Sequence, residues 1–383
     1  MKTLQTIVLL FSFVSIYACN EGIPKETAFT NEVEHTEPAT KHYIKVALLL
    51  DTSNSMDGLI DQAKAQLWEI VNELSYAKCR SARPNLQIAL YEYGNDGLSS
   101  RNGYIRKILP FTQDLDDVSK ELFSLTTNGG SEYCGTVIQA SLNELDWGND
   151  RDDLKMIFIA GNEPFTQGKV DYRDAGNNAK EKDVVVNTIF CGDYKHGVSS
   201  SWKDGATLTY GDYIAINHDK KTIHIASPYD DLILQLNIQL NGTYVPYGRR
   251  GRMKIAVQEE QDSNAAGYSK ENAVSRTVSK SSHLYKNSSW DLVDAEEEEG
   301  FSYDELKNED LPENLKGKSK SQIKAYVQEQ KAERNRIQKE ISELNKQRRE
   351  FIATQKKDNS NGLESAMIEA LKKQASKKDY TWN

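Results

Sequence analysis

The segment 51–55, with the sequence DTSNS, contains the most informative cluster of polar side chains in the chain. It directly follows an apolar run, 44–50, that has the length and composition of a strand buried on both faces of a parallel sheet. Ligands of such sheets bind in the crevice at the carboxyl ends of the strands. The carboxylate of Asp51 and the hydroxyls of Ser53 and Ser55 would converge there as oxygen ligands for a hard cation such as Mg²⁺. The alternative is a plain helix cap, for which Asp and Ser are also favoured.

The elements that would position this cluster alternate between strand and helix patterns. Helical spacing of apolar residues predicts helices at 63–74, 118–125, 137–145, 173–182 and 230–240. Apolar or β-branched runs predict strands at 44–50, 86–91, 154–160, 184–190 and 213–216. This alternation predicts an α/β fold with a doubly wound, mostly parallel sheet flanked by helices, ending near Asn241.

The Asp-x-Ser-x-Ser pattern after a buried strand resembles the metal-ion-dependent adhesion site (MIDAS) of von Willebrand factor A (vWA) domains, and the resemblance covers about residues 42–241. It implies that Asp51, Ser53 and Ser55 bind a divalent cation, with Mg²⁺ expected and Mn²⁺ or Ca²⁺ as alternatives. In the family, a Gly-Thr pair at the start of a later helix supplies a further ligand. Gly135-Thr136 is similar to that pair, so Thr136 is the expected hydroxyl ligand, with a helix cap as its alternative role.

Two further loops bear on the metal. The glycine-rich loop 128–134 carries Glu132, which could act as an additional or alternative carboxylate ligand. After the strand at 155–159, the family usually has Thr-Asp-Gly, whereas this chain has Gly161 at the position of the aspartate. Asn162 or Glu163 could replace the missing ligand, although Glu163 could equally be an ordinary loop residue.

A cation held by few negative ligands keeps excess positive charge and attracts a carboxylate from outside. The resemblance therefore implies a metal-dependent adhesion or scaffold protein whose protein partner presents a carboxylate. An enzyme is not expected, because the sequence has no His-x-x-x-His, Gly-x-Ser-x-Gly or phosphate-binding Gly-Lys-Ser/Thr motif. The net charge of -9 argues against a nucleic-acid partner. In an alternative hypothesis, the C-terminal helices bind the partner in an envelope assembly or stress complex, and the vWA domain is structural or regulatory.

The first eighteen residues have the layout of an export signal, with Lys2 before an apolar run and small residues after it. The sequence 16–19, IYAC, resembles a bacterial lipobox, which predicts cleavage before Cys19 and lipidation of its thiol; an ordinary cleaved signal is the alternative. Residues 19–41 are polar and predict a flexible tether. We therefore expect a lipid-anchored protein of the cell envelope that faces the periplasm or the exterior, with the lipid as its only membrane contact.

Three cysteines remain in an oxidising compartment where disulfides persist. Cys134 precedes the helix at 137–145 and Cys191 follows the strand at 184–190, so both are expected at the carboxyl edge of the sheet. We hypothesise a disulfide between them. Cys79 follows the first helix and is expected at the opposite edge, too far away for a bridge.

The composition changes after residue 241. Residues 242–300 are interpreted as a linker with a possible strand at 253–257 and an acidic run at 296–299. Residues 301–383 are interpreted as a charged helical extension with one long helix at 318–357 and a second at 364–375. Apolar residues recur there in a heptad frame that Gln330, Arg334 and Arg348 interrupt. Packing against the chain's own domain or within a hairpin is favoured, and self-association as a coiled coil is the alternative; the oligomeric state stays open.

Overall fold

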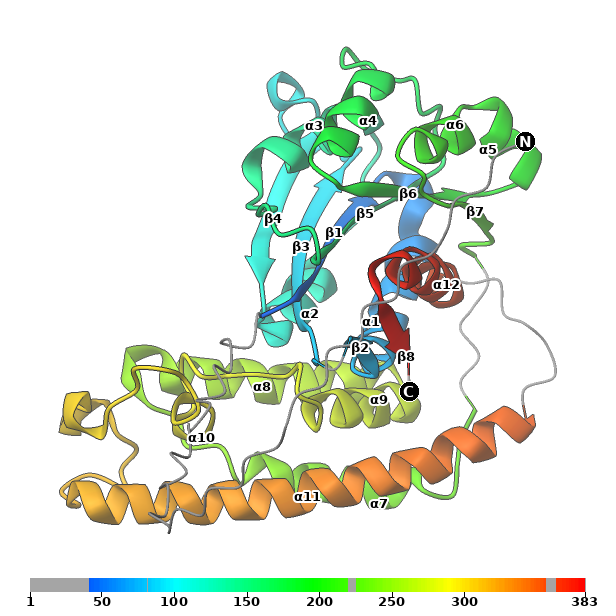
Figure 1. The fold of residues 1–383 in the computed structure, drawn as a ribbon. Coiled ribbons are helices and arrows are strands. Elements are labelled where there is room, and N and C mark those ends of the chain that lie inside the picture. The colour runs from blue at the N-terminus through cyan, green and yellow to red at the C-terminus, as the bar shows by residue number, and fades with distance from the viewer. Residues whose placement is uncertain (1–40, 81, 220–224, 356–362, 383) are drawn as a thin grey trace, which may run out of the picture. The chain divides into compact units, whose positions relative to one another are not determined.

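A six-stranded sheet with the order β4-β3-β1-β5-β6-β7 forms the centre of the fold in the computed structural model, which describes residues 41–80, 82–219, 225–355 and 363–382 (Figure 1). All neighbouring strands are parallel except β4, which is antiparallel to β3. The strands are β1 (Tyr43–Asp51), β3 (Asn85–Tyr93), β4 (Ile105–Thr112), β5 (Leu154–Gly161), β6 (Val185–Cys191) and β7 (Tyr213–Ile216). The predicted signal, Cys19 and nearly all of the tether lie outside the described residues.

Helices cover both faces of the sheet, because alternate side chains of the central strands point to opposite sides. Ile44, Val46 and Leu48 of β1 belong to one apolar core, and Ala47 and Leu49 belong to the other. The first core contains residues of α1 (Asp57–Leu74), α2 (Leu115–Ser124) and α12 (Leu363–Ala375). The second contains residues of α3 (Cys134–Glu144), α4 (Tyr172–Glu181) and α6 (Trp202–Thr207), and α5 (Tyr194–Ser199) precedes α6. The predicted doubly wound α/β fold is thus confirmed.

The helix that completes the sheet domain is not the one that the sequence indicated. The predicted last helix of this domain, α7 (Asp230–Asn241), packs against α9 (Lys270–Lys280) and α11 (Lys320–Gln355). Its expected place is taken by α12 from the C-terminus, which packs on α1 and touches β5, β6 and β7 (Figure 1). The side-chain carbonyls of Gln62 and Gln66 on α1 accept hydrogen bonds from the first backbone N–H groups of α12. The short strand β8 (Tyr380–Trp382) then pairs antiparallel with β2 (Ala77–Cys79).

Residues 242–300 are helical, so the interpretation as a linker with a strand at 253–257 is wrong. They form α8 (Gly248–Tyr268), α9 and α10 (Leu292–Ala295). The buried face of α8 includes Lys254, Gln258 and Gln261, so its helical period is carried largely by polar residues and does not show in the apolar pattern. The Lys254 ammonium lies 2.7 Å from the Asp114 carboxylate of the α2 cap and 2.5 Å from that of Asp117 in α2.

Buried ion pairs fasten these helices to the sheet domain and to one another. The guanidinium of Arg276 on α9 is 1% exposed and binds Asp116 of α2 at 2.8 Å. On α11, Arg334 binds Asp291 at 2.7 Å, and Arg348 binds Asp230 at 3.0 Å.

These two arginines interrupt the heptad frame of α11 because they face carboxylates of the same chain. The favoured prediction, packing against the chain's own residues, agrees with this arrangement, whereas the predicted hairpin of α11 with α12 is wrong because α12 packs on α1. Among the described residues, no helix is long and apolar enough to cross a membrane.

Candidate metal-binding site

Asp51 is the last residue of β1 and lies at the carboxyl edge of the sheet, where the sequence placed it. It is paired with Tyr93, the last residue of β3, and the preceding Leu50 is paired with Ala160 near the end of β5. Three loops therefore begin at one point of this edge. The Asp51 side chain is fully buried, and its Oδ1 accepts a hydrogen bond of 2.8 Å from the backbone N–H of Ser53.

The two serines and Asn162 form a hydrogen-bonded chain beside Asp51. The hydroxyls of Ser53 and Ser55 are 3.2 Å apart, and the amide nitrogen of Asn162 donates to the Ser55 hydroxyl at 3.1 Å. Asn162 follows β5 directly, so it connects the loop after β5 to the loop after β1. This contact places Asn162 beside Ser55, so its predicted role as a replacement for the missing aspartate is compatible with its position.

Gly161 itself has no room for a side chain. A Cβ at this position would lie 2.5 Å from the Tyr93 hydroxyl and 3.1 Å from Oδ2 of Asp51. The Tyr93 hydroxyl is fixed there because it donates to the carbonyl of Ala160 at 3.0 Å. An aspartate at position 161 would therefore collide with this tyrosine, so a ligand from this loop would have to come from another residue.

Glu132 is the residue from the glycine-rich loop that reaches Asp51. Its side chain is 2% exposed, and its carboxyl lies within hydrogen-bonding reach of the Asp51 and Ser53 side chains. Both acids border Gly94, where a Cβ would lie 2.6 Å from Oδ1 of Asp51 and 2.8 Å from Cγ of Glu132. Gly94 has a φ of 79°, a conformation that favours glycine, so the end of β3 leaves space for two carboxyl groups side by side.

Thr136, the expected hydroxyl ligand, lies elsewhere. It is in the first turn of α3, and its Cγ2 lies 3.2 Å from the position of a Cβ on Gly103, in the loop that leads to β4. Among the described residues, none forms a hydrogen bond with its hydroxyl. The structure thus brings Glu132 next to Asp51, whereas no described contact links Thr136 to Asp51, so Thr136 as a ligand stays a prediction.

Glu163 contributes its backbone instead of its carboxylate. Its N–H donates to Oε2 of Glu132 at 3.3 Å, and its carbonyl accepts a hydrogen bond of 2.8 Å from the indole of Trp202. The side chain itself is exposed. The prediction of Glu163 as a metal ligand is therefore not supported by its position, but its N–H holds Glu132 toward Asp51.

Backbone contacts bring these loops together. The carbonyl of Thr52 accepts from the N–H of Asn128 at 2.9 Å, and the N–H of Thr52 donates to the carbonyl of Tyr93 at 2.9 Å. A Cβ on Gly130 would lie 2.2 Å from the carbonyl oxygen of Gly94, so only glycine permits this close approach. These contacts place Glu132 next to Asp51 before any ligand binds.

The carboxyl groups of Asp51 and Glu132 face each other in a buried site, so ionisation of one disfavours ionisation of the other. Burial and the facing Glu132 carboxyl raise the pKa of Asp51 well above its usual range, and burial also raises the pKa of Glu132. Oδ2 of Asp51 and Oδ1 of Asn162 are buried without a hydrogen-bond donor among the described residues. A bound divalent cation would satisfy both oxygens and remove the repulsion between the acids.

The donor set fits a hard cation. Two carboxyl groups, two hydroxyls and one amide oxygen are all oxygen ligands of the kind that Mg²⁺, Mn²⁺ and Ca²⁺ prefer. Among the described residues, no group of three or more His, Cys, Asp or Glu side chains is placed to hold a metal ion. A site here would therefore depend on Ser53, Ser55 and Asn162 as well as on the two acids.

The predicted disulfide does not form. Cys79, Cys134 and Cys191 are all free thiols and buried. Cys134 belongs to the core on one face of the sheet and Cys191 to the core on the other, so the sheet itself separates them. The two residues share the carboxyl edge, as expected, but their side chains point to opposite faces.

A doubly wound sheet with a cluster of oxygen donors at its carboxyl edge is the arrangement that the sequence predicted for this part of the chain. Residues 45–198 match the family model of the von Willebrand factor type A domain. This part of the chain is a vWA domain, as the Asp-x-Ser-x-Ser pattern indicated. A comparison with curated protein sequences found no match.

Several solved structures are similar to the chain. BatB from Bacteroides thetaiotaomicron, a conserved hypothetical protein, has 16% identity, and the match covers 45% of this chain and 90% of that one with a TM-score of 0.35. Proximal thread matrix protein 1 from the mussel byssus, with a zinc-occupied MIDAS motif, has 15% identity over 47% and 43% of the two chains and a TM-score of 0.36. The SpRpn10 VWA domain has 14% identity over 45% and 87%, with a TM-score of 0.35.

Proposed function

We propose that this chain is a binding protein, not an enzyme, and that its vWA domain holds a divalent cation which captures a carboxylate of a protein partner. The observation that carries the proposal is the convergence of Asp51, Glu132 and Asn162 from three loops at one edge of the sheet, with two buried oxygens that lack a hydrogen-bond donor among the described residues. Mg²⁺ is the expected ion, with Mn²⁺ and Ca²⁺ as alternatives. The bound cation would supply an electrophilic centre with a coordination position open to the partner.

The arrangement of the donors supports a replaceable external ligand. The Ser53 and Ser55 hydroxyls and the Asn162 amide are neutral, so the two acids alone would balance the charge of the ion. Asp51 is fully buried and Glu132 is 2% exposed, so neither can follow the ion outward. The half-exposed Asn162 marks the side of the site that is open to solvent. A partner carboxylate would complete the shell from that side.

For the whole protein, we propose a lipid-anchored location in the bacterial cell envelope. The support is the lipobox-like sequence 16–19 and the polar segment that follows it. Mass spectrometry of the protein purified from membranes would test this: the proposal requires an N-terminal peptide that begins with a diacylated Cys19. An unmodified thiol at this residue would contradict it.

The metal-dependent step is tested by calorimetric titration of Mg²⁺ and Mn²⁺ into the purified protein, followed by partner capture from envelope extract. We expect binding of one ion per chain and capture that both a chelator and Asp51→Asn abolish. Asp174→Asn, which removes an exposed carboxylate from α4, is the matched control and should behave as wild type. Capture that survives both the chelator and Asp51→Asn would contradict the proposal.

A second candidate function rests on α11. This helix of 36 residues buries one side and leaves the other exposed, including Lys339, Glu343 and Lys346. Partner capture through this face would make the vWA domain structural or regulatory. Deletion of residues 301–383 is unsuited to test it, because α12 belongs to the core of the vWA domain. The triple charge reversal K339E/E343K/K346E distinguishes the candidates: loss of capture there, with none in Asp51→Asn, favours α11.

A further inference from the structure

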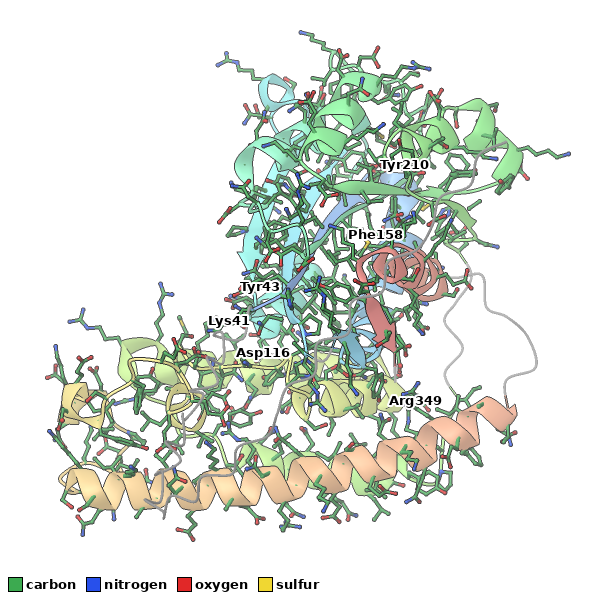
Figure 2. All side chains as sticks on the ribbon, in the orientation of Figure 1. Lys41, Tyr43, Asp116, Phe158, Tyr210 and Arg349 are labelled. Atoms are coloured by element: carbon green, nitrogen blue, oxygen red, sulfur yellow. The ribbon has the colours of Figure 1, made fainter. Side chains whose placement is uncertain are left out.

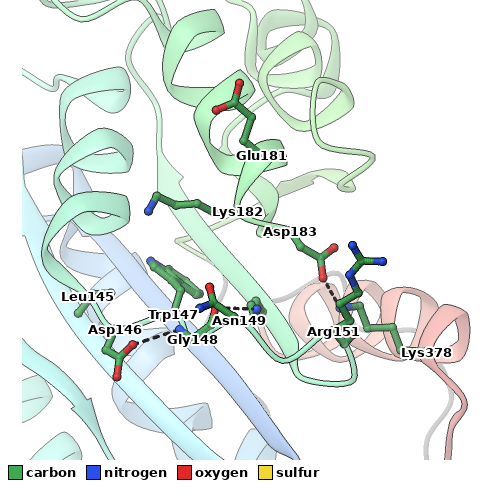
Figure 3. A pocket seen from close by; sticks show the side chains of 11 residues that line it. Leu145, Asp146, Trp147, Gly148, Asn149, Arg151, Glu181, Lys182, Asp183 and Lys378 are labelled. Carbon is green, nitrogen blue, oxygen red and sulfur yellow. Dashed lines mark hydrogen bonds and ion pairs between the residues drawn. The ribbon is translucent and has the colours of Figure 1, made fainter.

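A large cavity lies at the opposite end of the sheet from Asp51. It has a volume of about 740 Å³ and is lined by Trp147, Arg151, Lys155 and Lys182 among others (Figure 3). A second cavity of about 370 Å³ shares the lining residues Lys155, Asp183 and Lys378 with it, and we refer to the two neighbouring cavities together as the basal groove. This basal groove follows the amino ends of β5 and β6.

The basal groove is positively charged, in contrast to the chain, whose net charge is -9. Its lining contains six basic and three acidic side chains. The basic residues are Arg151, Lys155, Lys180, Lys182, Lys377 and Lys378, and the acidic residues are Asp146, Glu181 and Asp183. A local surplus of cations in an acidic protein favours an anionic ligand.

The acids of the groove do not neutralise this surplus. The Asp183 carboxylate is paired with the Lys378 ammonium at 2.7 Å, and Asp146 accepts a hydrogen bond of 3.1 Å from the backbone N–H of Gly148. The Glu181 carboxylate points away from the other labelled side chains of the groove (Figure 3). Among the described residues, no carboxylate forms an ion pair with Arg151, Lys155 or Lys182.

Lys155 differs from the other basic residues of the lining because it is buried. Its side chain is 3% exposed, and its ammonium donates to the carbonyl of Gly148 at 2.9 Å, which leaves its other N–H donors without a described acceptor. Burial lowers its pKa, although the nearby Asp183 and Asp153 carboxylates act in the opposite direction. Lys45, 7% exposed, donates to the carbonyl of Asp146 at 3.0 Å from the same side of this turn. Burying ammonium groups costs free energy unless an anion compensates for it.

We propose that the basal groove binds the phosphate group of an anionic ligand. Phosphate carries up to two negative charges and several acceptor oxygens, so it can accept from more than one basic group of the lining at once, whereas a carboxylate has only two oxygens. The volume of the larger cavity falls in the range of small-molecule sites. The phosphate could belong to a soluble phosphate ester or to a phospholipid headgroup. A headgroup is a candidate because β1 begins at this edge of the sheet, where Tyr43 lies (Figure 2), and the proposed lipid anchor precedes β1 in the chain.

Calorimetry with inorganic pyrophosphate in the presence of a chelator tests the proposal on the full chain. We expect binding that weakens about tenfold in Lys182→Glu and in Arg151→Glu, because each variant reverses one exposed, unpaired charge. Lys120→Glu reverses an equally exposed and unpaired charge on α2, outside the groove, and should leave binding unchanged. Equal weakening in Lys120→Glu would overturn the proposal, since binding would then be general surface attraction.

Two further variants locate the binding more narrowly. Lys155→Met should abolish pyrophosphate binding while its melting temperature stays close to that of wild type; a folded Lys155→Met that binds normally would overturn the role of this lysine. Asp51→Asn should bind pyrophosphate like wild type, so this test is independent of the metal site.

Vesicles of phosphatidylcholine with and without phosphatidylglycerol identify the source of the phosphate. Binding to the anionic vesicles that the groove variants weaken indicates a headgroup, and binding to pyrophosphate alone indicates a soluble ester. Binding to neither probe contradicts the proposal.

Discussion

Replacement of Glu132 by glutamine should have opposite effects on the metal-free and the metal-bound protein. In the metal-free protein, the buried Glu132 and Asp51 carboxyls face each other, and the glutamine amide would relieve their repulsion and donate an N–H to Asp51. We expect the free energy of unfolding in chelator to rise by about 1 kcal/mol. In the presence of Mg²⁺ the same change removes one of two negative ligands, and we expect the affinity to fall about a hundredfold.

These two effects can be read from one set of urea denaturation curves. At a Mg²⁺ concentration about a hundred times its Kd, the wild type should gain roughly 2.7 kcal/mol from the ion. A variant with a hundredfold weaker affinity should gain only about 0.4 kcal/mol at the same concentration.

Thr136→Val is the control, because the described contacts of Thr136 are with the loop at Gly103 and not with Asp51, and it should gain as much as wild type. If Thr136→Val lost the stabilisation and Glu132→Gln kept it, the assignment of the ligands would be refuted.

Three further predictions concern the stability of the chain. Arg334→Met leaves Asp291 buried without its partner and should lower the free energy of unfolding by about 3–5 kcal/mol in urea, whereas Arg336→Met on the exposed side of α11 should change it by less than about 1 kcal/mol. Leu371→Ala should cost about 2–5 kcal/mol, since this α12 side chain is 2% exposed in the sheet core; a negligible loss would show that α12 is not part of it. Burial lowers the pKa of His283 to about 4, so the folded state disfavours the protonated ring and stability is lost as the pH falls from about 6.5 toward 4. Because the ring is partly exposed, we expect His283→Gln to reduce the loss between pH 7 and pH 5 by about 1 kcal/mol, and an equal loss in both proteins would argue against this.

The sheet was predictable because its strands are buried on both faces and therefore appear as apolar runs. β1 and β5 have every residue after Tyr43 buried, which is the pattern that the runs 44–50 and 154–160 indicated. The edge strand β4 was missed, since its burial is partial and irregular and it contains Arg106, Lys107 and Pro110. The apolar pattern of such an edge strand is weak, because pairing with its neighbour β3 contributes much of its stability.

The partners of the helices could not be predicted in the same way. The apolar spacing of α7 and of α12 shows that each has a face to bury, but it does not say against what. Which of the two completes the sheet depends on contacts with residues about 300 positions away, such as the hydrogen bond from the backbone N–H of Glu364 to Gln66. The arginines of α11 were read as interruptions of a heptad, although each is satisfied by a buried aspartate.

In the candidate site, the residues fixed by the end of a strand were predictable and those on loops were less so. Asp51 and the two serines follow from β1 alone. The choice between Glu132 and Thr136 depends on how the loop before α3 approaches the sheet, which Gly94 and Gly130 control by leaving room for it. The failed disulfide has a similar cause, since a position at one edge of a sheet does not specify the face to which a side chain points.

The most direct test is a crystal structure of the protein grown with Mn²⁺, with anomalous diffraction used to locate the ion. The prediction is one anomalous peak at the carboxyl edge of the sheet, within coordination distance of Asp51, Glu132 and the serine hydroxyls. A peak that lies only elsewhere, or an Asp51 carboxylate that contacts protein groups alone under saturating Mn²⁺, would contradict the assignment of this edge as a metal site.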